Sequence, residues 1–325
     1  MSIQIQVQPL LASDYDHVKA LSKLHMAGRH GAFSLAEQLD SKKMIARYVL
    51  RDCSSGALLG YALLAEQIAP MVKLRVEVVA HEGETREIYY PVLYEAVEFD
   101  IIAAAPYSVE ARVFGTSADE RRFYESAGYR EDHRMVHYGL DVAALDLESE
   151  STKQPANVSG SSIIIRSMAD ECRERPDCME ALTELVLDTN TDFPTELPVH
   201  LRQPNTDTGW LHKPDLVPDA FFIAIDRGNY AGYTVLYPSA EEAYAFQGNT
   251  AVRRDYRNKG IATALKKSVI AFAKRHSIRS IYTSTRSTNP AMASVNEKLG
   301  WKVSYSELRM VNWFHSPGHG HIHNR

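Results

Sequence analysis

Two parts of this chain resemble each other at a constant distance of 172 residues. GALLGYALL at Gly56–Leu64 precedes GNYAGYTVL at Gly228–Leu236 by that distance, and ESAGY at Glu125–Tyr129 precedes EKLGW at Glu297–Trp301. Single residues agree at the same offset: Leu93 with Leu265, Val97 with Val269, Ser108 with Ser280, and Thr116 with Thr288. Because widely separated matches share one ungapped offset, the sequence predicts two tandem copies of one fold.

A polar stretch separates the two copies. SESTKQPANVSGSS at residues 149–162 is rich in serine and has few apolar anchors, which is typical of a linker. The sequence therefore predicts a first domain over residues 1–148 and a second over residues 163–314, and 325 residues suffice for two domains of ordinary size. Residues 315–325 are expected to form a disordered, histidine-rich tail, with histidines at His315, His319, His321 and His323.

Each copy alternates strand-like and helix-like segments. Both begin with a short apolar strand followed by a helix, and the second copy continues through a hairpin, a longer strand and two helices. In that copy the predicted strands are Ile163–Ile165, Phe221–Asp226, Tyr230–Leu236, Ala243–Val252 and Ile281–Thr285, and the predicted helices are Cys178–Leu187, Gly260–His276 and Pro290–Leu299. The order predicts an α/β fold in which each copy has a mixed central sheet flanked by helices.

Composition excludes several classes of protein. The net charge is −5, from 36 basic and 41 acidic residues, which argues against a nucleic-acid-binding protein with a basic surface. No apolar run approaches the ~20 residues of a membrane span, and MSIQIQVQPL lacks the features of a signal peptide. The three cysteines Cys53, Cys172 and Cys178 suggest neither a metal site nor a disulfide framework, so we expect a cytoplasmic protein.

The segment Thr250–Leu265, TAVRRDYRNKGIATAL, carries the strongest functional signal. A strand ends at Val252, a charged turn follows, and Arg257, Gly260 and Ala262 stand at the entrance of an amphipathic helix. The first turn of a helix has free backbone N–H groups and the positive end of the helix dipole. Small residues there let a pyrophosphate approach, and Arg257 and Lys259 supply positive charge, so the segment predicts a phosphate-binding loop.

With this loop the second copy resembles the GNAT superfamily of acyl-CoA-dependent N-acetyltransferases. The resemblance covers residues 163–314 and rests on TAVRRDYRNKGIATALK and NPAMASVNEKLGW, which are similar to the pyrophosphate motif and to a later motif of that superfamily. The tandem layout is similar to that of mycothiol-synthase-like proteins. The resemblance implies two tandem GNAT-like domains and acetyl-CoA as the cosubstrate, with no metal required.

The resemblance also implies roles for individual residues. Backbone groups of Ala251 and Val252 would line the acetyl thioester, Arg257–Thr263 would hold the pyrophosphate, and Asn289 and Asn296 would border the CoA arm. The implied cofactor-binding set is Ala251, Val252, Arg253, Arg257, Asn258, Lys259, Gly260, Ile261, Ala262, Thr263, Asn289 and Asn296.

The first copy lacks the phosphate loop. At the offset of 172, Arg257 corresponds to Thr85, Gly260 to Ile88 and Ala262 to Tyr90. Larger side chains at the helix entrance would occupy the space that a pyrophosphate needs. We therefore expect a degenerate first domain without a CoA site, and we interpret Tyr124, at the usual position of a catalytic tyrosine, as structural.

The catalytic groups are less well defined. Asn296 stands where the superfamily pattern has a tyrosine, and an amide does not donate a titratable proton. Tyr282, Tyr305 and Tyr256 are alternative acids that sequence does not rank. Glu242, at the start of the long strand, is a candidate base. Asp192 and Phe193 are candidates for binding a cationic acceptor, although an ordinary turn also explains them.

These observations predict an N-acetyltransferase that moves an acetyl group from acetyl-CoA to a primary amine by direct attack in a ternary complex. The acceptor would be a small molecule or peptide, and a monomer is favoured because two joined copies can mimic a dimer. Transfer of another acyl group, O-acetylation and a non-catalytic acyl-CoA sensor are the alternatives. The expected partners include neither nucleic acid nor membrane.

Overall fold

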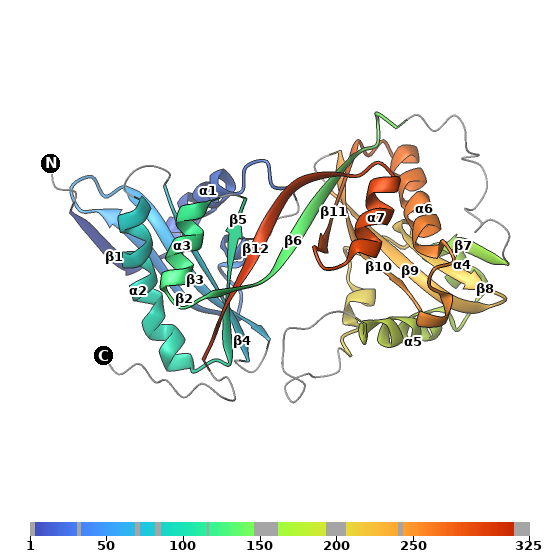
Figure 1. The fold of residues 1–325 in the computed structure, drawn as a ribbon, viewed down its shortest axis with the longest axis horizontal. Coiled ribbons are helices and arrows are strands. Elements are labelled where there is room, and N and C mark those ends of the chain that lie inside the picture. The colour runs from blue at the N-terminus through green and yellow to red at the C-terminus, as the bar shows by residue number, and fades with distance from the viewer. Residues whose placement is uncertain are drawn as a thin grey trace. The chain divides into compact units, whose positions relative to one another are not determined.

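The computed structural model describes residues 4–30, 34–68, 72–81, 86–115, 117–145, 162–192, 206–239 and 243–314. The histidine-rich tail lies outside these residues, as does the expected linker except for Ser162. The chain forms two compact units (Figure 1). The first contains Met1–Val136 and Tyr305–Arg325, and the second contains His137–Ser304.

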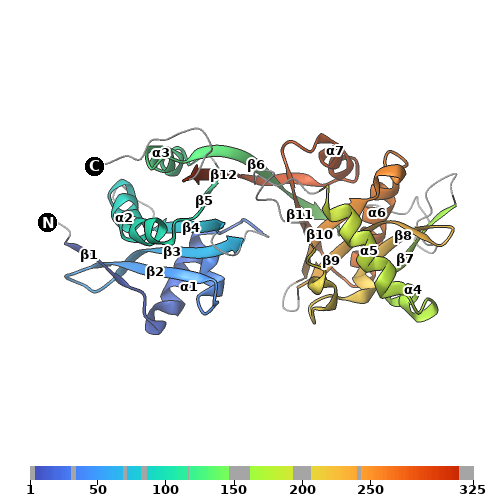
Figure 2. The ribbon, with the colours of Figure 1, turned by 90° about the horizontal axis from the view of Figure 1, so that it is seen from below.

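The first half of the chain folds into a sheet with helices on both faces. Its elements are β1 (Ile5–Pro9), α1 (Tyr15–His25), β2 (Met44–Asp52), β3 (Leu58–Ile68), β4 (Lys73–Ala80), α2 (Arg86–Ala104), β5 (Ser108–Phe114), α3 (Ala118–Ser126) and β6 (Arg130–Asp141). Apolar residues of α2 and α3 pack on one face of the sheet and those of α1 on the other, as Figure 2 shows.

The second half repeats this order. Its elements are β7 (Ile163–Ser167), α4 (Met168–Glu174), α5 (Cys178–Asn190), β8 (Phe221–Asp226), β9 (Asn229–Pro238), β10 (Tyr244–Val252), α6 (Ile261–Arg275), β11 (Ser280–Arg286), α7 (Pro290–Lys298) and β12 (Lys302–Trp313). Each strand and helix expected from the sequence of this copy is present, with ends that differ by a few residues at most. The expected mixed sheet flanked by helices is thus confirmed in both copies.

Paired glycines show that the two copies are structurally equivalent. Gly60 of β3 lies so close to β4 that an added Cβ would meet the Val79 carbonyl oxygen at 2.7 Å. Gly232 of β9 lies equally close to β10, where an added Cβ would meet the Ala251 oxygen at 2.6 Å. Because each pair of positions differs by the same 172 residues, the close approach of these two strands has been retained in both copies.

The two units exchange their last strands. In the first unit the strand order is β1-β2-β3-β4-β5-β12, so the C-terminal strand of the chain pairs antiparallel with β5 from Glu307↔Phe114 to Trp313↔Ser108. In the second unit the order is β6-β11-β10-β9-β8-β7. The boundaries of the compact units therefore differ from those of the two sequence copies, residues 1–148 and 163–314. The division into these two domains remains a prediction.

A disulfide closes the turn between α4 and α5. The sequence analysis expected no disulfide, but Cys172 and Cys178 are joined, with 5.0 Å between their Cα atoms. That expectation was wrong because the end of α4 and the start of α5 meet across a turn. Cys53 is free and exposed.

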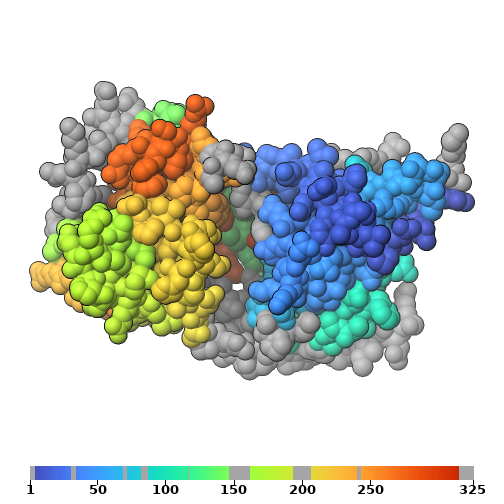
Figure 3. Space-filling view, turned by 180° about the vertical axis from the view of Figure 1, so that it is seen from behind, coloured from blue at the N-terminus to red at the C-terminus, as the bar shows by residue number. Residues whose placement is uncertain are grey.

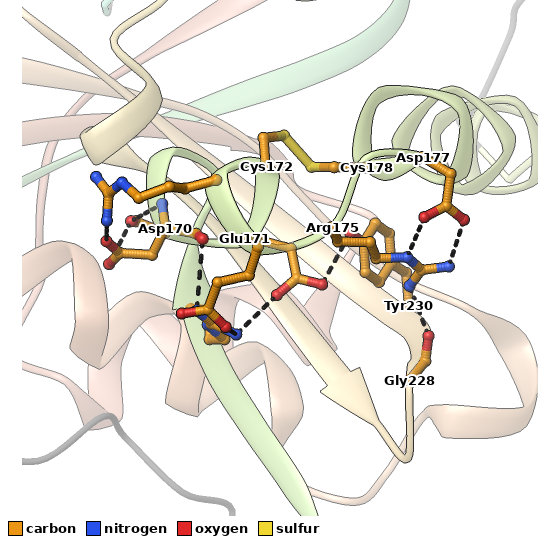
Figure 4. Close-up of polar contacts among 12 residues, drawn as sticks. Asp170, Glu171, Cys172, Arg175, Asp177, Cys178, Gly228 and Tyr230 are labelled. Carbon is orange, nitrogen blue, oxygen red and sulfur yellow. Dashed lines mark hydrogen bonds and ion pairs between the residues drawn. A yellow bond between two sulfur atoms is a disulfide. The ribbon is translucent and has the colours of Figure 1, made fainter.

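Arg175, in the turn between α4 and α5, binds this turn to the β8–β9 hairpin (Figure 4). Its guanidinium donates to both carboxylate oxygens of Asp177, at 2.9 and 3.0 Å, and to the Gly228 carbonyl at 2.7 Å. It also lies over the Tyr230 ring, whose hydroxyl donates to Glu171 at 3.1 Å. The N-terminal end of α5 is therefore fixed to the sheet. The yellow-green surface in Figure 3 belongs to this part of the chain.

Within the described residues, none of the helices combines the length and the apolar character needed to span a membrane. The same residues hold no group of three or more histidine, cysteine or carboxylate side chains placed to bind a metal ion.

Candidate functional site

The strands β10 and β11 separate at the centre of the second unit. They pair in parallel only from Tyr244↔Ser280 to Phe246↔Tyr282, although β10 continues to Val252. The register of β10 against β9 shifts between Gln247 and Thr250, which marks a bulge. Beyond Phe246 the edge of β10 that faces β11 is therefore not covered by the parallel pairing.

The backbone N–H of Val252, the last residue of β10, is directed toward this open edge. The Arg253 N–H donates to the Ala231 carbonyl of β9 at 2.9 Å. Because successive residues of a strand direct their N–H groups to opposite sides, the Val252 N–H is directed away from β9, toward the gap beside β11. The role of Val252 at the thioester remains a prediction.

The expected phosphate loop is an open turn before a helix. Arg254–Tyr256 form a short 3-10 helix, and both Asn258 (φ +60°) and Gly260 (φ +79°) have left-handed backbone conformations. Gly260 is the N-cap of α6, with no capping side chain and no acidic residue in the first turn. The first N–H groups of α6, at Ile261, Ala262 and Thr263, therefore form an uncapped positive helix end.

The arginines of this loop already have carboxylate partners on α5 and just beyond it. Arg253 pairs with Glu184 at 3.0 Å and with Asp188 at 3.5 Å, and Asp192 pairs with both Arg254 and Arg257. Glu184, Asp188 and Asp192 are spaced four residues apart, so they follow one side of the helix. Arg257 also donates to the Val252 carbonyl at 3.1 Å. Its side chain therefore ties the loop to the end of β10.

Asp192 was one candidate for binding a cationic acceptor, and in the structure its carboxylate pairs with Arg254 and Arg257. These two guanidinium groups hold the pKa of Asp192 below its usual range. Arg254 donates to one carboxylate oxygen of Asp192 and Arg257 donates to the other. The sequence did not indicate this contact, because more than sixty residues separate Asp192 from either arginine. Phe193 and Glu242 lie outside the described residues.

The two asparagines of the later motif have different surroundings. The Asn289 side chain caps α7 by accepting from the Met292 N–H at 3.1 Å. Asn296 is 0% exposed, and neither polar atom of its amide has a hydrogen-bond partner among the described residues. An unpaired buried amide lowers the stability of a fold by about 1–3 kcal/mol, so a ligand that hydrogen-bonds it would recover free energy.

The candidate tyrosines are dispersed. Tyr282 is half-buried on β11 and packs edge-to-face on Tyr244, with ring centroids 5.8 Å apart. Tyr256 lies in the loop beneath the Lys259 ammonium, 5.0 Å from its ring centroid. Tyr305 lies in the part of β12 that belongs to the first unit, and its hydroxyl donates to the His30 carbonyl at 3.3 Å.

In the first unit, helix α2 begins earlier in the repeat than α6 does in the second. Helix α2 already includes Arg86 and Ile88, which correspond to Asn258 and Gly260 of the second copy. Tyr90 is buried and donates to Glu120 at 3.1 Å, and Tyr124 is buried in the core beside Tyr129. Thr85 lies outside the described residues. The first copy thus keeps the fold but does not repeat the open helix entrance.

Lys266 is a residue of the site region that sequence reasoning missed. It lies on α6 but is only 1% exposed, among side chains of β10 and the start of β12. A lysine in an amphipathic helix is normally solvated, so the sequence contains no signal for its burial.

A family model now identifies this arrangement. Residues 179–301, which contain the divergent strands, the loop and α7, match the model described as the acetyltransferase (GNAT) family. The second copy is thus the part of the chain that matches the GNAT family. Comparison with curated protein sequences gives no match.

Solved structures extend the likeness to the whole chain. A GCN5-related N-acetyltransferase from Sphaerobacter thermophilus has 17% identity and a TM-score of 0.72, with 96% of each chain covered. A tandem GNAT protein from the clavulanic acid biosynthesis pathway has 20% identity and a TM-score of 0.65, covering 96% of this chain and 99% of that one. The chain therefore has the fold of two tandem GNAT-like domains.

Proposed function

We propose that the chain is an acetyl-CoA-dependent N-acetyltransferase whose active site lies in the second GNAT domain. The observation that carries the proposal is the uncapped N-terminus of α6, which follows Gly260 beside the separated strands β10 and β11. A pyrophosphate is the natural partner of such a helix end. The thioester would then lie along the open edge of β10.

Direct attack requires few protein groups. A free alkylamine has a pKa of about 10, so the acceptor must lose a proton to a base or to water before its lone pair attacks the thioester carbon. The Val252 N–H is placed to donate to the oxygen that gains negative charge. The carbon–sulfur bond then breaks and the CoA thiolate leaves, while the attached nitrogen gives its surplus proton to a base or to water and a neutral amide remains.

The proton routes are part of the same proposal. Glu242, two residues before β10 in the sequence, remains the candidate base. The Asn296 amide does not protonate the thiolate, but it can hydrogen-bond the sulfur. A thiol of pKa about 8.5, by analogy with cysteine, leaves without an acid near pH 8, so we propose unassisted departure. Tyr282, Tyr256 and Tyr305 are the alternative acids.

An acceptor screen tests this function. Purified protein is incubated with acetyl-CoA and a panel of amines that includes small amines, polyamines, amino sugars and peptides. Free thiol is followed over time, and products are identified by mass spectrometry. We expect amine-dependent thiol release and an acetylated product.

The second candidate, an acyl-CoA sensor, is favoured by one observation, the absence of a tyrosine at Asn296. A sensor binds CoA in a calorimetric titration but releases no thiol with any acceptor. Thiol release with alcohols but not amines would instead indicate O-acetylation. A preference for longer acyl-CoA would indicate another acyl group. A cytoplasmic location and a monomeric state remain predictions.

A further inference from the structure

Lys266 is a fully buried lysine with no charged partner among the described residues. It is 1% exposed, and its Nζ donates to the Gln247 Oε1 at 2.7 Å and lies 4.8 Å from the centroid of the Trp301 ring. Among the described residues no carboxylate forms an ion pair with it. Burial alone lowers the pKa of Lys266 to about 7. Since an unpaired buried ammonium is costly, a helix that needed only apolar packing would not place lysine here.

The contacts of Lys266 continue to the bulge of β10. Gln247 uses its Nε2 to donate to the Thr234 hydroxyl at 2.9 Å and the Thr250 hydroxyl at 3.3 Å, and these two hydroxyls lie 2.8 Å apart. Gln247 and Thr250 are the two residues between which the register of β10 shifts. The network therefore spans both ends of the bulge.

Lys266 also determines how the Gln247 amide is oriented. A lysine side chain donates hydrogen bonds and, when charged, accepts none, so the amide oxygen must face Nζ. The amide nitrogen is then directed to the two threonine hydroxyls. The Thr283 hydroxyl of β11 donates to the backbone carbonyl oxygen of Gln247 at 3.1 Å, at the point where β10 and β11 stop pairing.

We propose that Lys266 is a positioning residue that holds the β10 bulge and thereby the backbone of Ala251 and Val252 against the thioester. The catalytic consequence rests on the proposed function, whereas the effect on the bulge does not. Lys266 acts through Gln247 and Thr250 and touches neither the acetyl group nor the acceptor. The pyrophosphate loop, which precedes it on the same helix, is a separate binding feature.

Lys266→Met tests the proposal, since methionine retains most of the apolar volume and lacks the donor. Lys267→Met is the matched control, because Lys267 is the next residue of α6 and is exposed. Hydrogen–deuterium exchange of peptides covering residues 244–252 is measured without CoA. We expect faster exchange there in Lys266→Met, with exchange in the first unit unchanged and Lys267→Met like wild type.

Kinetics then separate positioning from binding. In Lys266→Met we expect kcat to fall about tenfold, as for loss of one positioned hydrogen bond, while the dissociation constant for CoA stays within about twofold. Lys266→Gln, which keeps an N–H donor, should recover part of both readouts. Gln247→Met should reproduce the loss, and the double variant should be no worse than either single variant.

The outcomes are distinguishable. If hydrogen–deuterium exchange in residues 244–252 of folded Lys266→Met is the same as in wild type, Lys266 does not hold the β10 bulge, whatever the catalytic activity of the variant. Faster exchange with unchanged kcat would overturn its link to catalysis. If wild type binds no CoA and releases no thiol, the proposed function fails, while the exchange experiment still decides whether Lys266 holds the bulge.

Discussion

At the scale of single residues, the site contains side chains whose presence lowers the stability of the free protein. Asn296 is buried with both polar atoms of its amide unpaired, and Lys266 is buried without a counter-ion. Asn258, which is not a glycine, is held in a left-handed conformation. Functional sites commonly retain such local costs because a bound ligand or a required geometry offsets them.

Asn296→Leu should separate stability from function. Replacing an unpaired buried amide with an apolar group of similar shape removes its desolvation penalty, so we expect the free energy of unfolding to rise by about 1–3 kcal/mol. Turnover and CoA affinity should fall if the amide serves the CoA arm. Chemical denaturation and calorimetry measure the two effects. A clear loss of stability in this variant would show that the amide has a partner in the free protein.

Gly260→Ile transfers the residue of the first copy, Ile88, into the second. We expect CoA affinity to fall more than tenfold, because the branched side chain stands at the helix end and resists a φ of +79°. The strain itself should lower stability by about 1–2 kcal/mol.

Gly56→Ile is the matched control for this substitution. Gly56 has a φ of +70° with open space around its Cβ position, so it carries the same strain outside the loop. It should lower stability but leave CoA affinity unchanged. Equal CoA affinity in Gly260→Ile and wild type would show that the phosphate loop is misplaced.

The stability of the protein should depend on pH through Lys266. The pKa of Lys266 is about 7 in the folded protein against 10.5 in the unfolded chain. Between these values the unfolded chain binds more protons at this site, so stability should rise with pH by about 1 kcal/mol per pH unit relative to Lys266→Met. Below pH 7 the difference should be constant. Denaturation of both proteins at pH 6 to 9 checks this, and parallel curves would contradict it.

At the scale of elements, sequence periodicity predicted most strands and helices of the second copy but missed α4, Met168–Glu174. β8 matches its predicted range, Phe221–Asp226, residue for residue, and α6 differs from its prediction by one residue at each end. Local signals decide such boundaries: the Arg227–Gly228 turn has two left-handed residues, and Gly300 follows α7 with a φ of +91°.

Contacts between distant elements were not predictable in this way. The pairing of Asp192 with Arg254 and Arg257, and the contact of Lys266 with Gln247, depend on how helices pack on the sheet. Neither residue type nor spacing distinguishes a lysine that reaches into the sheet from one that reaches into solvent. The cofactor-binding role of the loop residues remains a prediction.

The turn between α4 and α5 gives a prediction for the disulfide. The Cys172→Ser, Cys178→Ser double variant should lose about 2 kcal/mol of stability, as expected for a short closed loop. Cys53→Ser, which alters the free and exposed cysteine, should behave as wild type. Denaturation with and without a reductant measures the difference. Indistinguishable curves for the double variant and oxidised wild type would show that the bond contributes nothing to stability.

At the scale of the whole molecule, one of the two copies has the features of a CoA site. The second unit has an open turn and an uncapped helix end, whereas the first has helix α2 at the equivalent positions. Calorimetric titration of the intact chain with acetyl-CoA should therefore give one site per chain. Two equivalent sites would contradict the interpretation of the first copy.

The repeat in the sequence predicted the tandem fold but not the exchange of strands. β6 and β12 are long strands that follow corresponding helices, so their sequences fit either sheet. Which sheet each strand joins is decided by pairing with a partner far away in sequence, such as β12 with β5. The same ambiguity explains why the compact units do not coincide with the two repeats.

This exchange makes the two gene copies interdependent. A polypeptide that ends before residue 149 would contain β6 but not its neighbour β11. One that begins at residue 163 would contain β12 but not its neighbour β5. Each fragment alone would leave an unpaired sheet edge, a surface prone to aggregation. Supplied together, each would provide the strand that completes the other's sheet. We therefore expect the first copy to be needed for the fold of the second, whether or not it binds CoA.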